Sequence, residues 1–360
     1  MKFSGIGGQA VLEGVMMRSR DGYSIAVRRE DGKIVSKTEK NVRFSTKHKW
    51  AGWPFIRGVV SLVESLKVGI GTLMWSSDPE GEDEKEGKGI TKGEMTWTMI
   101  IAVLLAVGIF VVLPMLVANL FRRLGLPEWV IKVIEGVLRL VIFLLYIMLT
   151  SLVKDIRRTY QYHGAEHKSI NCIESGHALT VENVMKSSRE HRRCGTSFIL
   201  IVMLIAILIF ILIPLPKVTI AGYERLSTIL TRLAGIGIRI ALIPFVAAIS
   251  YEIQQYTGRH DNLFTKIISR PGMWLQRLTT REPDEGMCEV AIEAVENVFD
   301  WRAFLRENFP DAVIPEEPAE ENAEEEAGEA SAEEAIPEEA GDIKETTEEK
   351  LPEDEENDLP

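Results

Sequence analysis

Residues 160–197 read YQYHGAEHKSINCIESGHALTVENVMKSSREHRRCGTS and lie between two apolar runs that are each long enough to cross a membrane. This stretch holds four of the six histidines and two of the three cysteines. His163, Glu166 and His167 form an H-x-x-E-H motif. Side chains four positions apart share one face of a helix, so His163 and His167 could bind one metal ion from the same side. The sequence therefore predicts an inverted zincin arrangement, with Glu166 as the general base that activates a water molecule.

A divalent metal site, with zinc as one candidate ion, needs at least three protein ligands. His191 and Cys194, which come just before the next apolar run, are the natural candidates for the third. Cys172 lies five residues after His167 and therefore off the face that the two histidines share, so it is a weaker candidate. Other residues that compete for the third position are Glu174, His177 and Glu252.

Two polar residues of the otherwise apolar segment near the N-terminus, Glu13 and Arg18, are predicted to support the site. A structural role is the alternative for the whole cluster, because interfacial histidines can simply hydrogen-bond to the backbone. In addition, the helix of the known inverted zincins belongs to a soluble α+β domain, and none is evident in this sequence. Gly164 inside the motif lowers helix propensity by about 1 kcal/mol relative to alanine.

Four apolar segments predict a polytopic helical membrane protein, with a four-helix membrane domain at 97–251. The predicted spans are 97–120, 136–153, 196–215 and 233–251, and Pro244 predicts a kink in the last one. Arg139 is expected to snorkel to the outer interface. Arg239 lies deeper in its span, and both a polar site in the membrane and snorkelling stay open for it.

Residues 53–75 are apolar with one polar stripe, formed by Arg57, Ser61, Glu64 and Ser65. This pattern favours an amphipathic interfacial or re-entrant helix over a simple span. The next residues, 76–95, are predicted to form a charged linker.

The orientation in the membrane follows from basic residues, which are more numerous in 1–50 and in the His-rich loop 154–195 than in the loops between them. Both termini, the loop and the segment 252–313 are therefore predicted to be cytoplasmic, at the cell membrane of a bacterium. We expect no cleaved signal peptide, since the first residues lack an apolar core. The lipid bilayer and other membrane proteins are the expected partners, and nucleic acid is not expected.

Outside the apolar segments, residues 1–50 are Gly-rich and predict a small β-hairpin over 23–38, with Asp31-Gly32 in a type I′ turn. From Asp284 onward, apolar residues recur at helical spacing and predict an amphipathic helix. The net charge of −12 is the sum of two unlike parts, since residues 316–360 hold 21 acidic residues and 2 lysines, a net of −19 that leaves +7 for residues 1–315. The Glu, Ala and Pro composition of residues 314–360 predicts a disordered acidic tail. Three cysteines give no disulfide pattern and favour a reducing compartment or a metal role over a secreted scaffold.

Long motifs connect these observations to a known family. They are GGQAVLEGVMMR (7–18), YHGAEHKSINCIE (162–174), HRRCGTSF (191–198) and PGMWLQRLTTREPDE (271–285). Over roughly residues 3–298 the chain resembles the YqhQ-type family of bacterial multi-pass membrane proteins. The resemblance implies a predicted metal-dependent enzyme and points to His163, Glu166, His167, His191 and Cys194.

The sequence thus predicts a mainly α membrane protein with about four transmembrane helices, a small hairpin and an acidic tail. The leading functional hypothesis is a metal-dependent, hydrolytic membrane enzyme with its site at the cytoplasmic face. The alternative is a non-enzymatic scaffold or accessory protein of a membrane complex. A transporter would need a polar path through the spans, and only Arg139 and Arg239 are charged there.

Overall fold

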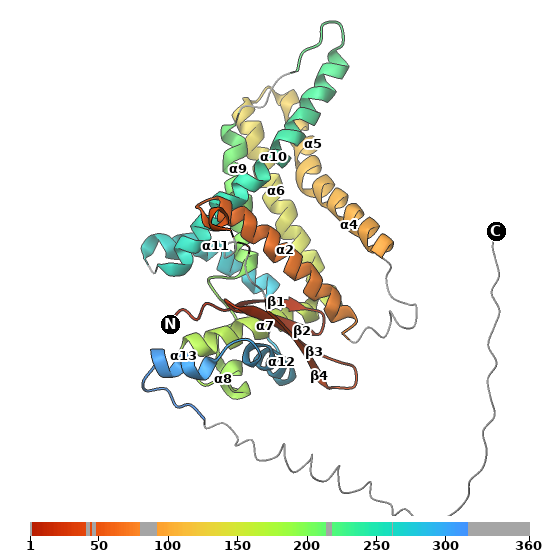
Figure 1. The fold of residues 1–360 in the computed structure, drawn as a ribbon. Coiled ribbons are helices and arrows are strands. Elements are labelled where there is room, and N and C mark those ends of the chain that lie inside the picture. Colours follow the sequence, from red (N-terminus) through yellow and green to blue (C-terminus); the bar gives the residue numbers. More distant parts are fainter. Residues whose placement is uncertain are drawn as a thin grey trace, which may run out of the picture. The chain divides into compact units, whose positions relative to one another are not determined.

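A computed structural model describes residues 2–40, 44, 48–79, 92–213, 218–260 and 262–315 (Figure 1). The predicted acidic tail lies outside the described residues from residue 316 onward, and so do residues 80–91 of the predicted linker. Helices extend into both ends of that linker, because α2 (Ile56–Ser77) ends and α4 (Lys92–Val107) begins within it.

The N-terminal residues form a four-stranded antiparallel meander in the order β1-β2-β3-β4. Its strands are β1 (Gly7–Val11), β2 (Gly14–Arg18), β3 (Gly22–Arg28) and β4 (Ile34–Lys40). The predicted hairpin is confirmed as β3–β4, in which Arg28 pairs with Ile34. The predicted type I′ turn is wrong. The Arg29 amide donates to the Lys33 carbonyl, which leaves a three-residue loop in which only Gly32 has a positive φ, of 87°.

Both faces of the sheet are buried over β1–β3, whose residues alternate between two hydrophobic clusters, whereas β4 is mostly exposed. Val15, Met17 and Ala26 pack in a core with Tyr162 of α7 (Lys154–Glu174), Val290 of α12 (Glu285–Glu296) and further residues of these helices. The same core includes α8 (Val181–Lys186) and α13 (Trp301–Asn308). The opposite face, with Met16 and Ile25, packs against Val68 and Trp75 of α2.

The strands, α7 and α12 therefore make an α+β body, which corrects the expectation that the chain has no such domain. Sequence reasoning missed it because its parts come from three distant segments, before, between and after the apolar helices (Figure 1). The predicted amphipathic helix is confirmed as α12. Asp284 caps α12 by accepting a hydrogen bond from the Met287 amide, and Met287, Val290, Ala291, Ala294 and Val295 are buried.

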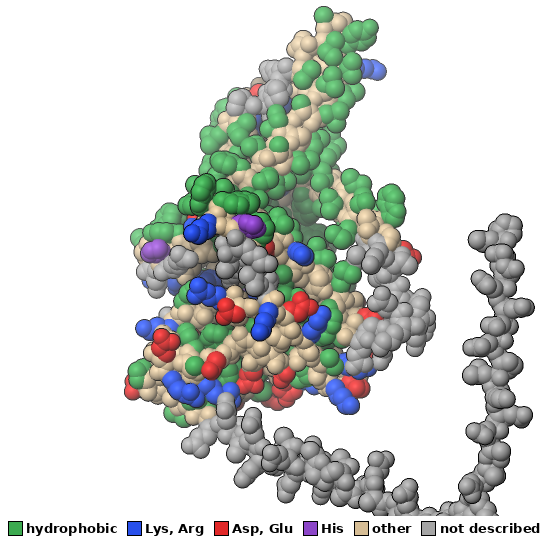
Figure 2. Space-filling model, viewed as in Figure 1, with side chains coloured by type: hydrophobic (Ala, Val, Ile, Leu, Met, Phe, Trp, Pro, Cys, Tyr) green, Lys and Arg blue, Asp and Glu red, His purple; other side chains and the backbone are tan. Residues whose placement is uncertain are grey.

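Among the described residues, five helices are long and apolar enough to cross a membrane. Figure 2 shows hydrophobic side chains over these helices and charged side chains over the α+β body. Four of the five correspond to the predicted spans, with shifted bounds. They are Thr96–Leu124, α6 (Glu128–Thr150), α9 (Gly195–Leu212) and the part Glu224–Gly258 of α10. The helix α10 itself covers Glu224–Arg259. The first contains a π-helical turn at Gly108–Val112, followed by α5 (Leu113–Leu120) and a 3-10 turn at Phe121–Leu124. α10 continues through Pro244.

The fifth helix is α2, which follows a 3-10 turn at Lys49–Gly52. At its first turn, the Arg57 guanidinium donates from Nε to Glu252 of α10 at 2.8 Å. At its last turn, the Ser76 hydroxyl accepts from the Leu12 amide, between β1 and β2, at 3.2 Å. α2 thus connects α10 to the sheet, and its place relative to a membrane stays a prediction. α11 (Leu263–Thr279) packs on α9, where Gly272 lies against Ser197.

Candidate metal centre

The H-x-x-E-H motif lies in the middle of α7, which continues through Gly164 without interruption. Gly164 has a packing role: a Cβ atom at this position would lie 2.0 Å from the carbonyl oxygen of Arg281. The absence of a side chain thus lets the segment after α11 run directly against α7. The Arg281 amide donates to the Tyr160 carbonyl at 2.8 Å and fixes this contact.

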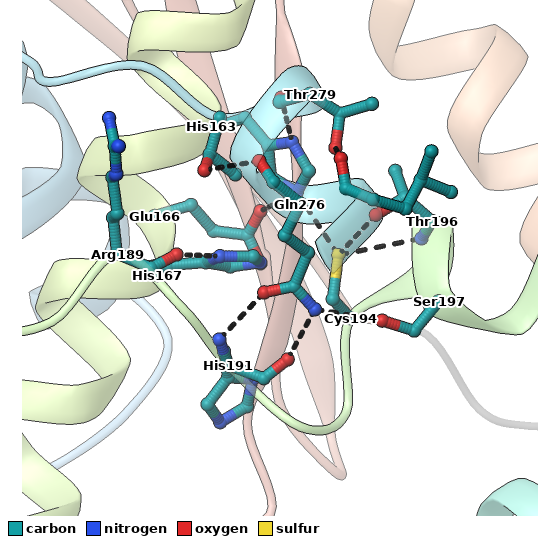
Figure 3. Close-up of polar contacts among 12 residues, drawn as sticks. His163, Glu166, His167, Arg189, His191, Cys194, Thr196, Ser197, Gln276 and Thr279 are labelled. Carbon is teal, nitrogen blue, oxygen red and sulfur yellow. Dashed lines mark hydrogen bonds and ion pairs between the residues drawn. The ribbon is translucent and has the colours of Figure 1, made fainter. Parts of the chain in front are cut away.

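Two backbone carbonyls orient the histidines of the motif (Figure 3). Nδ1 of His163 lies 2.9 Å from the carbonyl oxygen of Thr279, and Nδ1 of His167 lies 2.6 Å from that of Arg189. A carbonyl oxygen can only accept, so each Nδ1 must carry the hydrogen. Each Nε2 is then left with its lone pair, which is the tautomer that a metal-ligating histidine needs.

Cys194 brings its sulfur to the same point. Its residue is the N-cap of α9, and its Sγ accepts a hydrogen bond from the Thr196 amide at 3.4 Å. Sγ lies 3.2 Å from Nε2 of His163. The ligand atoms of His163, His167 and Cys194 all lie within 4.8 Å of one another, and all three residues are buried.

This group fits a metal ion on two grounds. Nε2 of His167 is fully buried and has no hydrogen-bond partner among the described residues, a state that costs free energy unless a ligand occupies it. Two imidazoles and one thiolate are also a donor set that suits zinc, which bonds nitrogen at about 2.0–2.1 Å and sulfur at about 2.3 Å. The His163, His167 and Cys194 group could therefore hold a metal ion.

Glu166 lies next to the group and is itself 5% exposed. One of its carboxylate oxygens is 3.9 Å from Nε2 of His163. Gly8 of β1 packs against it so closely that a Cβ atom there would lie 2.9 Å from Cγ of Glu166. The Glu166 side chain is thus packed between β1 and the histidines.

The electrostatics couple these groups. Burial by itself would lower the pKa of His163, but the neighbouring Cys194 and Glu166 raise it to about 9. Burial would raise the pKa of the Cys194 thiol, but His163 and His167 bring it well below its usual range. Burial raises the pKa of Glu166, against the lowering effect of the two histidines. In the absence of an ion, these shifts favour a thiolate at Cys194 beside a protonated His163, and binding of an ion would displace the proton from Nε2 of His163.

Of the two candidates for the third ligand, the geometry favours Cys194. The ring of His191 lies 5.7 Å from that of His167, and its Nε2 is directed to Glu174, 3.7 Å away. Glu174 also accepts hydrogen bonds from the amide and hydroxyl of Ser4 and pairs with Arg193. Burial by itself would raise the pKa of Glu174, but these partners lower it to about 2. His191 therefore lies beside a neighbouring ion pair of Glu174 and Arg193. Burial lowers the pKa of His191, and its Nε2, like that of His167, has no hydrogen-bond partner among the described residues.

The other candidates contact different parts of the protein. Glu13 pairs with Arg158, and Arg18 lies 3.8 Å from Glu64 of α2. Glu252 accepts from Arg57 at the junction of α2 and α10. Cys172 is buried in the α+β core, where its sulfur contacts the Ala178 carbonyl at 3.3 Å. His177 is exposed.

Sequence reasoning missed the roles of residues in the motif at 271–285, which position groups in and beside the site. Besides Thr279, these include Gln276, which is fully buried and clamps His191. Its Oε1 accepts from the His191 amide at 2.8 Å, and its Nε2 donates to the His191 carbonyl at 2.7 Å (Figure 3). A further bond from Nε2 reaches the Ser197 hydroxyl. The sequence offered one signal, namely that this motif occurs together with the histidine motifs. That signal does not assign a role to any single residue of the motif.

The fold and this site define a class: a polytopic helical protein in which an α+β body buries a His/Cys group beside apolar helices. The chain belongs to the family described as "Protein of unknown function (DUF1385)", which matches residues 53–301. It is also similar to "Uncharacterized protein YqhQ" of Bacillus subtilis (strain 168). The two are 33% identical over 317 residues, which cover 84% of this chain and 94% of that protein. The resemblance seen in the motifs is thereby confirmed. No solved structure matches the chain.

Proposed function

We propose that the protein is a metal-dependent enzyme, most simply a hydrolase, that works at the cytoplasmic face of the bacterial cell membrane. His163, His167 and Cys194 hold a divalent ion, for which zinc is the best match, and Glu166 is the general base. The observation that carries the proposal is the convergence of two carbonyl-oriented histidines and one thiol at a point where Nε2 of His167 has no partner.

Each residue of the site has a definite task in this proposal. The carbonyls of Thr279 and Arg189 hold the imidazoles so that both Nε2 atoms point into the site. Glu166 takes a proton from the attacking water and passes it to the leaving group. When bound, the ion would supply Lewis-acid polarisation of the bond to be hydrolysed. A substrate would reach the site most easily near His163, whose side chain is 12% exposed, compared with 7% for Glu166.

The location favours substrates at the membrane surface. Cys194 directly precedes α9, one of the apolar helices. The site therefore lies at the end of an apolar helix, and the distribution of basic residues supports a cytoplasmic location for that end. A lipid headgroup, a membrane-bound peptide or a soluble molecule near the surface would be within reach.

The first experiment is metal analysis of the detergent-solubilised protein. We expect about one ion per chain in the natural sequence and a loss of that ion in the His163→Ala/His167→Ala double variant. His177→Ala is the matched control, because His177 is exposed and follows the same helix. Glu166→Gln should retain the ion and lose any hydrolytic activity found. A natural protein without stoichiometric metal, after purification free of chelators, would favour the scaffold hypothesis instead.

A further inference from the structure

Three charged side chains are buried among the apolar helices, far from the metal centre. Glu135 and Arg139 of α6 are each 7% exposed, and Arg239 of α10 is 4% exposed. The expectation that Arg139 snorkels to an interface is therefore wrong: it lies inside the bundle. Arg139 is buried because it pairs with Glu135, which lies one residue before the predicted span of 136–153.

The hydrogen bonds in this cluster leave one arginine incompletely paired. Glu135 accepts from Arg139 with one oxygen at 2.9 Å and from Arg239 with the other at 2.8 Å. Arg139 also donates from Nε to the Phe110 carbonyl, in the π-helical turn. Nε and Nη1 of Arg239 are buried and have no acceptor among the described residues.

The charges do not balance either. One carboxylate serves two guanidinium groups, and arginine does not lose its proton in proteins. Lys132 adds a third positive charge nearby, and its ammonium group donates to the carbonyls of Ile211 and Ile213, both at 2.9 Å. A buried charge without a counter-ion is costly in a low-dielectric interior. The cluster thus has excess positive charge together with free donors.

A small cavity lies beside these donors. Its volume is about 10 Å³, and its lining includes Lys132, Glu135, Arg139, Phe210 and Arg239. A space of this size holds about one water-sized particle. The ring of Phe210 covers both guanidinium groups, with its centroid 5.3 Å from Arg139 and 5.7 Å from Arg239.

We propose that this cavity binds one small inorganic anion of halide size, held by the free Nε–H and Nη1–H of Arg239. Such an anion would accept the unpaired hydrogen bonds and balance the charge of the second arginine at once. Phosphate and sulfate, with five atoms each, are too large for the cavity. The site would therefore select halides from the anions of the cell.

Thermal unfolding of the full-length protein in detergent tests this proposal. Chloride and bromide should raise the midpoint temperature by about 3 °C or more over gluconate at equal ionic strength, and the rise should saturate with concentration. Sulfate and phosphate should act as gluconate does.

Two variants separate a specific site from a general salt effect. Arg239→Met leaves the neutral pair Glu135–Arg139, which should fold, and it should abolish the difference between chloride and gluconate. Glu135→Gln removes the competing carboxylate and should keep or enlarge the halide effect. Equal midpoints in chloride and gluconate for the natural protein, or a halide effect that persists in Arg239→Met, would overturn the proposal. Stabilisation by sulfate or phosphate but not chloride would do so as well.

Discussion

Replacing Gly164 by alanine should destabilise the protein and weaken the metal centre, although alanine is the better helix former. On propensity alone the substitution would stabilise α7 by about 1 kcal/mol. The new Cβ, however, would lie 2.0 Å from the Arg281 carbonyl oxygen, whereas ordinary contacts begin at 3.4 Å. The two segments would have to separate by about the difference, roughly 1.4 Å.

The cost of this separation can be worked out from its contacts. Overpacking against backbone costs about 1–3 kcal/mol. Loss of the hydrogen bond from the Arg281 amide to the Tyr160 carbonyl adds about 1 kcal/mol. After the gain in helix propensity, the net loss in the free energy of unfolding should be about 1–3 kcal/mol. Thr279 lies two residues before Arg281, so its carbonyl should also move away from His163.

The assay combines thermal unfolding in detergent with metal analysis. Gly164→Ala should lower both the midpoint temperature and the metal content. Gly71→Ala in α2 and Gly237→Ala in α10 are matched controls, because an added Cβ meets nothing within 4 Å at either position. They should be neutral or slightly stabilising. If Gly164→Ala were as stable as these controls and bound as much metal, the reasoning from the close approach would be refuted.

Further predictions concern the surroundings of the site and the placement of α2. Because the partners of Glu174 lower its pKa from 4.5 to about 2, its ionised form stabilises the protein above pH 4.5. The stability advantage over Glu174→Gln, at most about 3 kcal/mol, should therefore disappear as the pH falls from 5 to 2 in denaturant titrations. Gln276→Leu leaves the buried amide of His191 unpaired and leaves its carbonyl with only the long bond from the Cys194 amide, and it should cost about 1–3 kcal/mol in the same assay. Reporters placed after residue 50 and after residue 78 should lie on the same side of the membrane, since the last turn of α2 contacts the sheet. Opposite sides would make α2 a fifth span.

The parts of the fold that could be predicted are those with local signals. The spacing of His163 and His167 predicted their shared helix face, and the apolar periodicity after Asp284 predicted α12. The hairpin β3–β4 followed from Asp31-Gly32, although the loop is one residue longer than a type I′ turn allows. Each of these features depends on residues less than about 15 positions apart.

The rest depends on contacts between distant segments. β1 and β2 were missed because Gly8 and Gly14 weaken the strand pattern, and both glycines are needed for close approach. A Cβ on Gly14 would lie 2.2 Å from the Ala26 carbonyl oxygen, and Gly8 makes room for Glu166. The carbonyl of Thr279 orients His163 across 116 positions of the chain, and no periodicity reveals such a pair.

The way the α+β body is assembled has a consequence for biosynthesis. Its strands come first in the chain, α7 follows three of the five apolar helices, and α12 follows all of them. Since the ribosome releases the chain from the N-terminus, the face that packs against α2 can be covered early, but the face that packs against α7 and α12 is not fully covered until nearly 300 residues have been made. A newly made chain therefore exposes one apolar face of the sheet for most of its synthesis, and a chaperone or the membrane surface would have to shield that face. A premature stop before α12 should yield an aggregating fragment rather than a partly active protein.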